Sequence, residues 1–217
     1  MRYPSIFKSL ALLSFLGISL SAHGATPTEG FEYQLIQPPV PTETGDKIEV
    51  VELFWYGCPH CYHFEPYIQQ WLETKPDNVE FRRIPAVFNE VYALHARAFY
   101  TAEALGVAEK MQEPIFVAYH EQHNKLKDED ALAKLFALHG VSEEDFRKTF
   151  NSFFVDTKVR RARALSKEYG IDGVPTMVVN GKYRTSGTIA GGQENVIAVV
   201  DYLIGLESGK SSEQAKE

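Results

Sequence analysis

The hydrophobic pattern of residues 48–84 predicts a strand, a helix and a second strand. Residues 48–56 are almost continuously apolar and rich in valine and aromatic residues, which is typical of a strand buried on both faces. From Cys58 to about Lys75, apolar residues recur at helical spacing, and Pro76-Asp77-Asn78 ends the pattern. Residues 79–84 form the second predicted strand. Such a unit makes the two strands parallel with a right-handed crossover.

Helical spacing then dominates from about Phe88 to Tyr169. We expect helices that end at the capping glycines Gly106, Gly140 and Gly170, and a short helix that begins with a capping box at Ser142 and Asp145. This stretch is therefore predicted to be a helical insertion. The expected apolar stripes are Val91, Leu94, Ala98, Ala102 and Leu105; Leu132, Leu135, Phe136 and Leu138; Phe146 and Phe150; and Val155, Val159, Ala162 and Leu165.

The last part of the chain predicts a hairpin and a helix. Met177–Val179 and Lys182–Arg184 flank Asn180-Gly181, a pair that supplies the positive φ angles of a type I′ turn. A final helix is expected over about 193–206, followed by a frayed polar tail over 207–217.

The order of these elements predicts an α/β protein with a thioredoxin-like fold that is interrupted by an inserted helical domain. We place the thioredoxin-like domain at residues 25–88 and 170–217, and the inserted helical domain at 89–169.

The start of the chain has the pattern of a secretory signal peptide. Arg2 and Lys8 are basic, residues 10–20 are apolar but too short to span a bilayer, and Ala22-His23-Gly24 offers small residues to signal peptidase. We expect residues 1–24 to be removed and the protein to be exported, with a Gram-negative periplasm as the first choice. The alternative, a retained anchoring helix, is less favoured because the polar segment that follows offers no stop-transfer pattern.

Composition narrows the function classes. The chain has 217 residues, of which 44% are hydrophobic and 24% charged, and this excludes a disordered chain and a polytopic membrane protein. Lysine and arginine number 22 against 29 acidic residues, for a net charge of -7. Because no basic stripe offers a footprint for phosphates, we expect no nucleic-acid partner.

The two cysteines, Cys58 and Cys61, point to redox chemistry. A disulfide between them closes so small a loop that it stabilises the fold by only about 2 kcal/mol in the chain-entropy model. Cys58 lies where strand gives way to helix, so unpaired N–H groups and the helix dipole favour its thiolate. His60 adds positive charge when protonated, and Pro59 loses no hydrogen bond at a helix start. We expect Cys58 to be the nucleophile and Cys61 the buried resolving thiol.

Several motifs together carry a resemblance to a known family. They are residues 54–62 (Phe-Trp-Tyr-Gly-Cys-Pro-His-Cys-Tyr), residues 173–176 (Gly-Val-Pro-Thr), the hairpin at 179–183 and the helical insertion. The sequence resembles the DsbA family of periplasmic thiol:disulfide oxidoreductases. The resemblance suggests that the pKa of Cys58 falls from about 8.5 to near 4, which would make the protein an oxidant.

The same resemblance implies the course of the reaction. The Val174–Pro175 bond is expected to be cis and to lie across from Cys58, where its backbone pairs with an extended substrate segment. The protein then donates its disulfide to reduced substrate proteins, requires no metal or organic cofactor, and is reoxidised by a quinone-linked membrane partner of the DsbB type.

Glu52 interrupts the apolar strand six residues before Cys58. Either that face of the strand is wet or the carboxyl is partly protonated. The resemblance implies an acidic proton relay for Cys61 at this position, usually with a lysine on the adjacent strand. Here Arg83 takes the place of that lysine. Because arginine keeps its proton, we expect Glu52 to stay more ionised, and its relay role stays open.

Two alternatives to a monomeric disulfide donor remain. The first is a reductase or isomerase of the same fold, although isomerases usually need a dimerisation module and little chain precedes the first core strand. The second is a metal-binding protein that uses Cys58, Cys61 and His63 with His120 and His123, but structural zinc sites usually bring a second close pair of ligands. Haem attachment is excluded because residue 62 is tyrosine.

Overall fold

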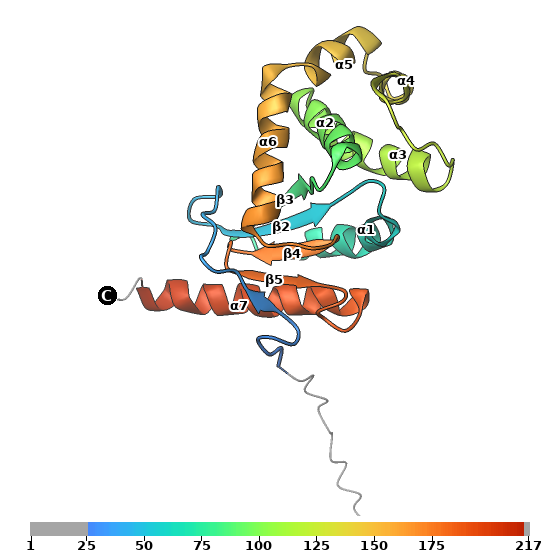
Figure 1. Cartoon of the computed structure of the whole chain (residues 1–217). Coiled ribbons are helices and arrows are strands. Elements are labelled where there is room, and N and C mark those ends of the chain that lie inside the picture. The colour runs from blue at the N-terminus through green and yellow to red at the C-terminus, as the bar shows by residue number, and fades with distance from the viewer. Residues whose placement is uncertain (1–25, 215–217) are drawn as a thin grey trace, which may run out of the picture.

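A five-stranded mixed sheet forms the centre of the molecule, with the strand order β1-β5-β4-β2-β3 (Figure 1). The computed structural model describes residues 26–214, so the expected signal peptide lies outside the described residues. As predicted, β2 runs parallel to β3, and it is antiparallel to β4 on its other side. The strands are β1 (Gln34–Leu35), β2 (Ile48–Phe54), β3 (Val79–Pro85), β4 (Thr176–Val179) and β5 (Tyr183–Ser186).

Helices cover both faces of this sheet. Helices α1 (Pro59–Leu72) and α7 (Val196–Gln214) pack on one face, and α7 is preceded by a 3-10 turn over Gln193–Asn195. Five helices lie between β3 and β4 in the chain and stand over the opposite face (Figure 1). They are α2 (Glu90–Ala104), α3 (Ala108–His120), α4 (Glu129–Leu138), α5 (Glu143–Phe150) and α6 (Phe153–Glu168).

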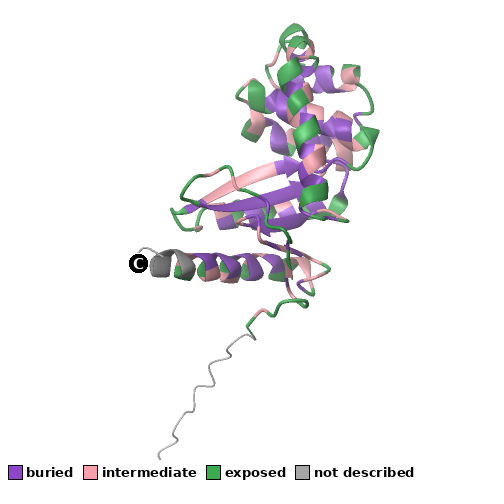
Figure 2. Cartoon of the chain, turned by 60° about the vertical axis from the view of Figure 1, so that its left-hand side comes forward, coloured by how far each residue is buried: buried purple, intermediate pink, exposed green. Residues whose placement is uncertain are grey.

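Strand β2 is buried along its whole length, as its apolar run predicts (Figure 2). Val50 packs into the core beneath α1 and α7, whereas Val51 and Leu53 pack into the core beneath the helical insertion. Each fully buried aliphatic side chain contributes about 1.5–3 kcal/mol, so this strand is the main hydrophobic link between the two halves of the fold.

Three of the inserted helices begin at asparagine or serine residues whose side chains cap the first backbone N–H groups. Asn89 caps α2 by accepting hydrogen bonds from the backbone N–H groups of Val91 and Tyr92. The predicted cap at Ser142 is confirmed, because Ser142 Oγ accepts a hydrogen bond from the backbone N–H of Asp145 at 3.1 Å, and the Asp145 carboxylate accepts one from the Ser142 hydroxyl at 2.6 Å. Ser152 caps α6 in the same way. Each cap contributes about 1 kcal/mol, which fixes the helix starts.

Three details of the sequence prediction are wrong in this domain. Helix α3 was not among the predicted stripes, and Pro114, which interrupts its backbone hydrogen bonding, lies inside it. Val91 and Leu138 were placed on buried stripes, yet they are 51% and 83% exposed. Helix α2 buries Ala93 and Ala96 beside the predicted Ala98, and α4 buries Leu132, Leu135 and Phe136 as predicted.

The predicted hairpin is confirmed by its turn. Asn180 and Gly181 have φ angles of 51° and 63°, as a type I′ turn requires. Gly181 is also needed for space, because a Cβ there would lie 1.9 Å from the carbonyl oxygen of Val40. The backbone of Val40 in turn donates to Gly181 O at 3.0 Å, which ties the hairpin to the N-terminal segment.

The polar tail predicted to be frayed from residue 207 instead continues α7 to Gln214. Glu207 is only 3% exposed and accepts hydrogen bonds from Asn180, Lys182 and Tyr183 of the hairpin. Burial raises the pKa of its carboxyl, but the hydrogen bonds from Lys182 and Asn180 outweigh burial and lower the pKa overall. Glu207 therefore joins the last helix to the sheet.

We predict that Glu207→Ala lowers the free energy of unfolding by about 1–3 kcal/mol at neutral pH, because it removes the hydrogen bonds that the buried carboxylate accepts from Asn180 and Lys182. The loss should shrink in acid, since a carboxyl with a lowered pKa stabilises the fold only while it is ionised. Urea denaturation at neutral pH and near pH 3 measures both effects. Glu73→Ala, at an exposed glutamate that follows α1, is the matched control and should change little.

Candidate active site

Cys58 is the residue from which helix α1 starts. It is the N-cap, with Pro59 at the first helical position, and its backbone N–H donates to the carbonyl of Trp55 at 3.0 Å. Gly57 allows this tight approach, because a Cβ there would lie 2.3 Å from the Trp55 ring. Both thiols are free in this structure; Cys58 is 8% exposed and Cys61 is fully buried. Of the two cysteines, only Cys58 therefore keeps any exposed surface.

The surroundings lower the pKa of Cys58 to about 6. The largest cause is the hydrogen bond from the Cys61 thiol, which burial opposes. The backbone N–H groups of Cys61 and His60 also favour the thiolate, although neither closes a capping hydrogen bond with the thiol. The charge of His60 is a smaller cause, and both His60 and Pro59 are exposed. The value is higher than the pKa near 4 suggested by sequence, because Cys58 is largely removed from water.

Cys61 is shifted in the opposite direction. Its pKa lies well above the ordinary value because it is buried, because it donates to Cys58, and because the charges of Cys58 and Glu52 disfavour a second anion. One thiol of the pair is thus disposed to ionise at neutral pH while the other keeps its proton.

The loop before β4 faces Cys58. The Val174–Pro175 peptide bond is cis, as expected from sequence, and Cys58 Sγ lies 3.3 Å from the carbonyl oxygen of Val174. A groove of about 770 Å³ runs beside this loop. It is lined by residues that include His60, Asp172, Val174, Pro175, Arg184 and Gln193.

Glu52 lies in β2 directly opposite Arg83 of β3, as the family resemblance implied. Arg83 Nε donates to Glu52 Oε2 at 3.2 Å, but Oε1 has no hydrogen-bond partner among residues 26–214. Arg83 also pairs with Glu65 and Glu109, at 3.1 Å and 3.6 Å. Three carboxylates thus share one guanidinium.

The expectation that Arg83 keeps Glu52 ionised is wrong. Glu52 is completely buried, and burial together with the charge of Glu65 raises its pKa to about 8 despite Arg83. The first sequence alternative, a wet strand face, is therefore excluded, and the protonated carboxyl remains.

Sequence reasoning missed the polar side chains that extend this cluster. Gln112 Nε2 donates to Glu65 Oε1 at 2.9 Å, and Tyr56 donates from its hydroxyl to Gln112 Oε1 at 2.9 Å. Gln112 is buried on α3, the helix that the sequence pattern did not reveal. The sequence signal that could have identified Gln112 is its helical spacing from the apolar residues Ile115 and Phe116.

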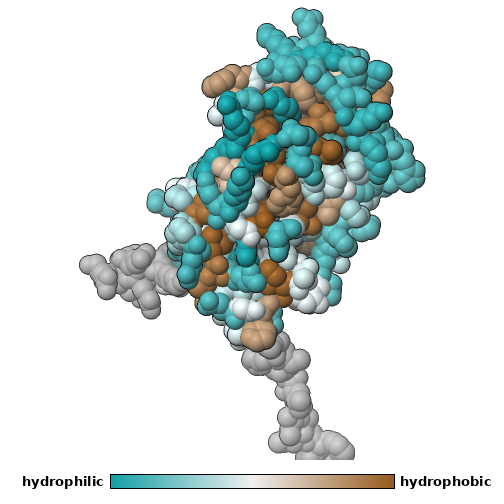
Figure 3. All heavy atoms as spheres, viewed as in Figure 1, coloured by the Kyte–Doolittle hydropathy of each residue, from teal (hydrophilic) through white to brown (hydrophobic). Residues whose placement is uncertain are grey.

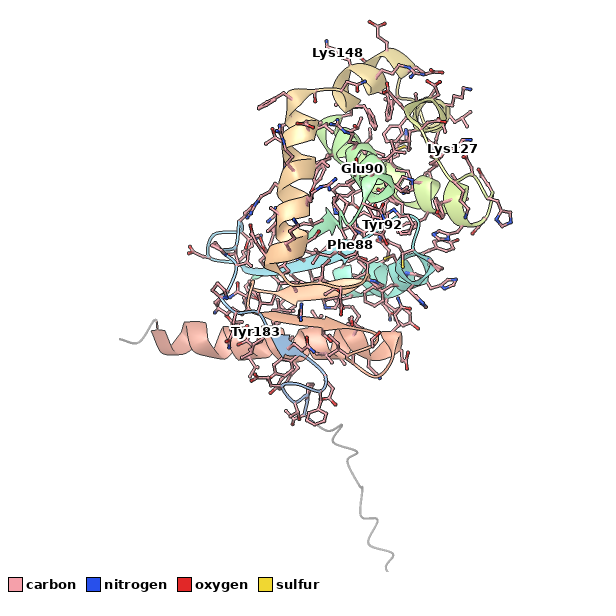
Figure 4. All side chains as sticks on the ribbon, viewed as in Figure 1. Phe88, Glu90, Tyr92, Lys127, Lys148 and Tyr183 are labelled. Atoms are coloured by element: carbon pink, nitrogen blue, oxygen red, sulfur yellow. The ribbon has the colours of Figure 1, made fainter. Side chains whose placement is uncertain are left out.

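Sequence reasoning also missed an aromatic cluster close to Cys58, formed by Trp55, Tyr92 and Phe88. Tyr92 stacks on Trp55 with ring centroids 4.1 Å apart, and Phe88 packs on Tyr92 at 5.3 Å (Figure 4). Burial and then the charges of Cys58 and Cys61 raise the pKa of Tyr92, so its ring lies within electrostatic reach of the sulfurs. Phe88 is 42% exposed. Figure 3 shows further apolar surface over the middle of the molecule, below the hydrophilic outer end of the insertion.

His120, one of the histidines considered as a metal ligand, makes contacts within the protein instead. His120 makes a 2.8 Å hydrogen bond through Nε2 to the carbonyl of Tyr56, and Tyr62 stacks on its ring. Burial lowers the pKa of His120, which favours the neutral ring as donor. Within residues 26–214, no group of three or more histidine, cysteine, aspartate or glutamate side chains is placed to hold a metal ion.

Comparisons with known proteins show the family to which the chain belongs. The model of the DSBA-like thioredoxin domain matches residues 83–199. The thiol:disulfide interchange protein DsbA of Pseudomonas aeruginosa strain PAO1 is 43% identical over 207 residues, which covers 95% of this chain and 97% of that protein. The chain belongs to the DsbA family. The DsbA of Pseudomonas syringae pv. tomato is 44% identical over 208 residues, covering 95% of this chain and 96% of that protein.

Solved DsbA structures agree with this membership. The crystal structure of Pseudomonas aeruginosa DsbA matches with a TM-score of 0.82 at 44% identity, over 86% of this chain and 97% of that chain. The structure of the oxidoreductase DsbA from Xylella fastidiosa gives 0.80 at 36% identity, over 85% and 99%. The predicted thioredoxin-like fold with a helical insertion is confirmed, and the protein is a thiol:disulfide oxidoreductase. In general terms, the family implies protein substrates and reoxidation by DsbB.

We predict that Glu52→Gln becomes more stable relative to the parent protein as pH rises from about 5 to 8. A carboxyl with a raised pKa keeps a proton that the unfolded chain releases, so the parent loses stability over this interval by up to about 1.4 kcal/mol per pH unit. Denaturation midpoints of the reduced proteins across this range measure the difference.

The control for this experiment is Glu49→Gln. Glu49 is also buried in β2, but Arg82 and the backbone N–H of Glu43 donate to its carboxylate. Its substitution should lower stability without producing the same gain with rising pH. Parallel pH profiles of Glu52→Gln and the parent would show that Glu52 is ionised in the folded protein.

Proposed function

We propose that this protein is an exported disulfide donor that transfers a Cys58–Cys61 disulfide to reduced substrate proteins. The observation that carries the proposal is the opposite environment of the two thiols. Cys58 caps α1, keeps 8% of its surface exposed and has a pKa lowered to about 6, while Cys61 is fully buried with a raised pKa. A thiolate stabilised in this way is a good leaving group, so its disulfide is readily given away.

The proposed reaction moves two electrons from the substrate to the protein. A substrate thiolate attacks Cys58 Sγ, a mixed disulfide forms, and the Cys58–Cys61 bond breaks. The Cys61 sulfur takes up a proton, because its raised pKa disfavours the anion. A second substrate thiolate then attacks the substrate sulfur of the mixed disulfide and releases Cys58 as a thiolate. The substrate leaves oxidised and the protein leaves reduced.

Glu52 is assigned the proton exchange with Cys61 in this scheme. Its carboxyl, with a pKa of about 8, holds a proton at neutral pH, and its charge acts on Cys61 when that proton is lost. The carboxyl therefore has a proton to give when the Cys61 sulfur becomes anionic. Pro59 supports the helix start without a donor, and His60 adds charge beside Cys58.

Substrate binding is assigned to the cis-proline loop. The carbonyl of Val174 is already within 3.3 Å of Cys58 Sγ, so a substrate cysteine that attacks Cys58 brings its own backbone alongside Val174. Pro175 carries no N–H that would compete for this edge, and the groove beside it accommodates an extended chain.

The proposal also assigns the domains of the protein, its compartment and the partner that reoxidises it. We assign residues 1–24 to a signal peptide, residues 25–88 and 170–217 to the thioredoxin-like domain and 89–169 to the helical domain. The protein then works as a periplasmic monomer without a metal or organic cofactor, and a quinone-linked membrane protein of the DsbB type reoxidises it. None of the helices in the described part of the chain is both long and apolar enough to cross a bilayer.

We predict that Cys58 of the reduced protein reacts with iodoacetamide with a midpoint near pH 6, because only its thiolate is nucleophilic. Cys61 should stay unmodified until well above neutral pH in the folded protein. Peptide mass spectrometry after short exposures at a series of pH values measures both cysteines. Cys58→Ser is the control and should leave Cys61 unreactive, whereas equal reactivity of the two thiols would contradict the proposal.

The relative stability of the two redox forms should change sign with pH. The lowered pKa of Cys58 stabilises the reduced fold fully above the unfolded pKa of about 8.5, and this contribution disappears as pH falls through about 6. It amounts to about 1.4 kcal/mol at pH 7 and about 3 kcal/mol at pH 8.5, against about 2 kcal/mol for the disulfide loop. Denaturant midpoints should therefore favour the oxidised form at pH 6 and the reduced form at pH 8.5. An oxidised form that is the more stable one at both values would instead indicate a reductase.

A further inference from the structure

A glutamine far away in the sequence reaches the peptide group between His60 and Cys61. Gln193 Nε2 donates a hydrogen bond to the carbonyl oxygen of His60. This carbonyl belongs to the first turn of α1, the turn whose N–H groups face Cys58. The contact therefore joins the active-site helix to the segment that precedes α7.

The turn that carries Gln193 is held by its own hydrogen bonds. Gly192 N donates to Gly187 O at 2.9 Å, and Ala190 N donates to Ser186 O at 2.8 Å. Asn195 Nδ2 donates to Ala190 O at 3.2 Å. The turn ends in α7, whose apolar residues are buried against the sheet. Gln193 is thus presented to His60 from a fixed support.

The hydrogen bond from Gln193 to the His60 carbonyl also affects the N–H of Cys61. The carbonyl of His60 and the N–H of Cys61 belong to the same planar group. A donor on the oxygen polarises the group and strengthens its N–H as a donor, which is how hydrogen bonds cooperate along a chain. The Cys61 N–H occupies the third helical position, the position that bonds to an N-cap side chain. In this protein the N-cap side chain is Cys58.

We propose that Gln193, acting through the His60–Cys61 peptide group, strengthens the interaction of the Cys61 N–H with the Cys58 thiolate and so makes the disulfide more oxidising. Gln193 is a positioning residue in this role, because it touches neither sulfur. The proposal rests on the proposed function of Cys58 as the nucleophile. It adds a residue of the C-terminal turn to the groups that set the redox equilibrium.

The size of the effect follows from the strength of the interaction. A hydrogen bond to a charged group contributes about 1.5–3 kcal/mol, and cooperation changes a bond by about 10–30%. Gln193→Ala should therefore raise the pKa of Cys58 by about 0.1–0.7 unit, with a similar shift in the logarithm of the glutathione equilibrium constant. Gln193→Glu should raise it further, because an ionised carboxylate donates no hydrogen bond and places a negative charge beside His60.

The matched control is Asn195→Ala. This change removes a hydrogen bond within the same turn but no contact with His60. The other charged groups along the groove, His60, Asp172 and Arg184, stay in place in all three variants. The pKa of Cys58 is read from the ultraviolet absorbance of the thiolate, and the redox equilibrium is read by titration with reduced and oxidised glutathione.

The proposal expects the pKa of Cys58 and the glutathione equilibrium to shift together in the order parent, Gln193→Ala, Gln193→Glu, while Asn195→Ala matches the parent. An unchanged pKa in both Gln193 variants would overturn it. An equal shift in Asn195→Ala would overturn it too, because the effect would then belong to the shape of the turn. Failure of the proposed function is distinguishable, since it would show in the parent protein as a Cys58 pKa at the ordinary value.

Discussion

The chemistry of the site depends on the lowered pKa of Cys58, which is caused chiefly by the hydrogen bond from the Cys61 thiol and is supported by the backbone N–H groups of Cys61 and His60 in the first turn of α1. Strand β2 ends at Phe54, Gly57 packs against the Trp55 ring, and the chain then enters the helix directly at the cysteine. A helix start is worth about half a positive charge. The buried strand, the tight loop and the cis-proline segment together hold the Cys58 sulfur at this point, 3.3 Å from the carbonyl oxygen of Val174.

Burial has the opposite effect on the groups beneath Cys58, because it raises their pKa values. Cys61 and Glu52 are both removed from water, and both have raised pKa values. Arg83 does not prevent this at Glu52, because burial and the charge of Glu65 raise the pKa by more than Arg83 lowers it. The site thus separates its roles by solvation: an anion is stabilised at Cys58, and protons are retained beneath it. That separation gives the exchange reaction a direction, since the buried sulfur is released only when a proton is available to it.

The parts that depend on local pattern could be predicted from the sequence. The buried strand, the hairpin turn at Asn180-Gly181, the helix cap at Ser142 and the position of Cys58 each follow from neighbouring residues. Helix α3 was missed because Pro114 and mixed polarity hide its spacing, and the end of α7 was missed because its hydrogen bonds come from a distant hairpin. The prediction of how far Glu52 is ionised failed for a similar reason. The sequence identifies Arg83 as its partner, but only the fold shows that the carboxyl is completely buried and that Arg83 also pairs with two other glutamates. Gln193 has no sequence signal, since its partner lies across the fold.

The central claim is that the environment of Cys58 makes the disulfide oxidising, and the reduction potential of the parent protein tests it most directly. Thioredoxin, with a cysteine pKa of about 7, has a potential of about -270 mV. A Cys58 pKa of about 6 stabilises the reduced form further by about 1.4 kcal/mol, or about 30 mV for two electrons. Equilibration with glutathione at neutral pH should therefore give a potential of about -240 mV, less negative than that of thioredoxin. A value at or below that of thioredoxin would contradict the account.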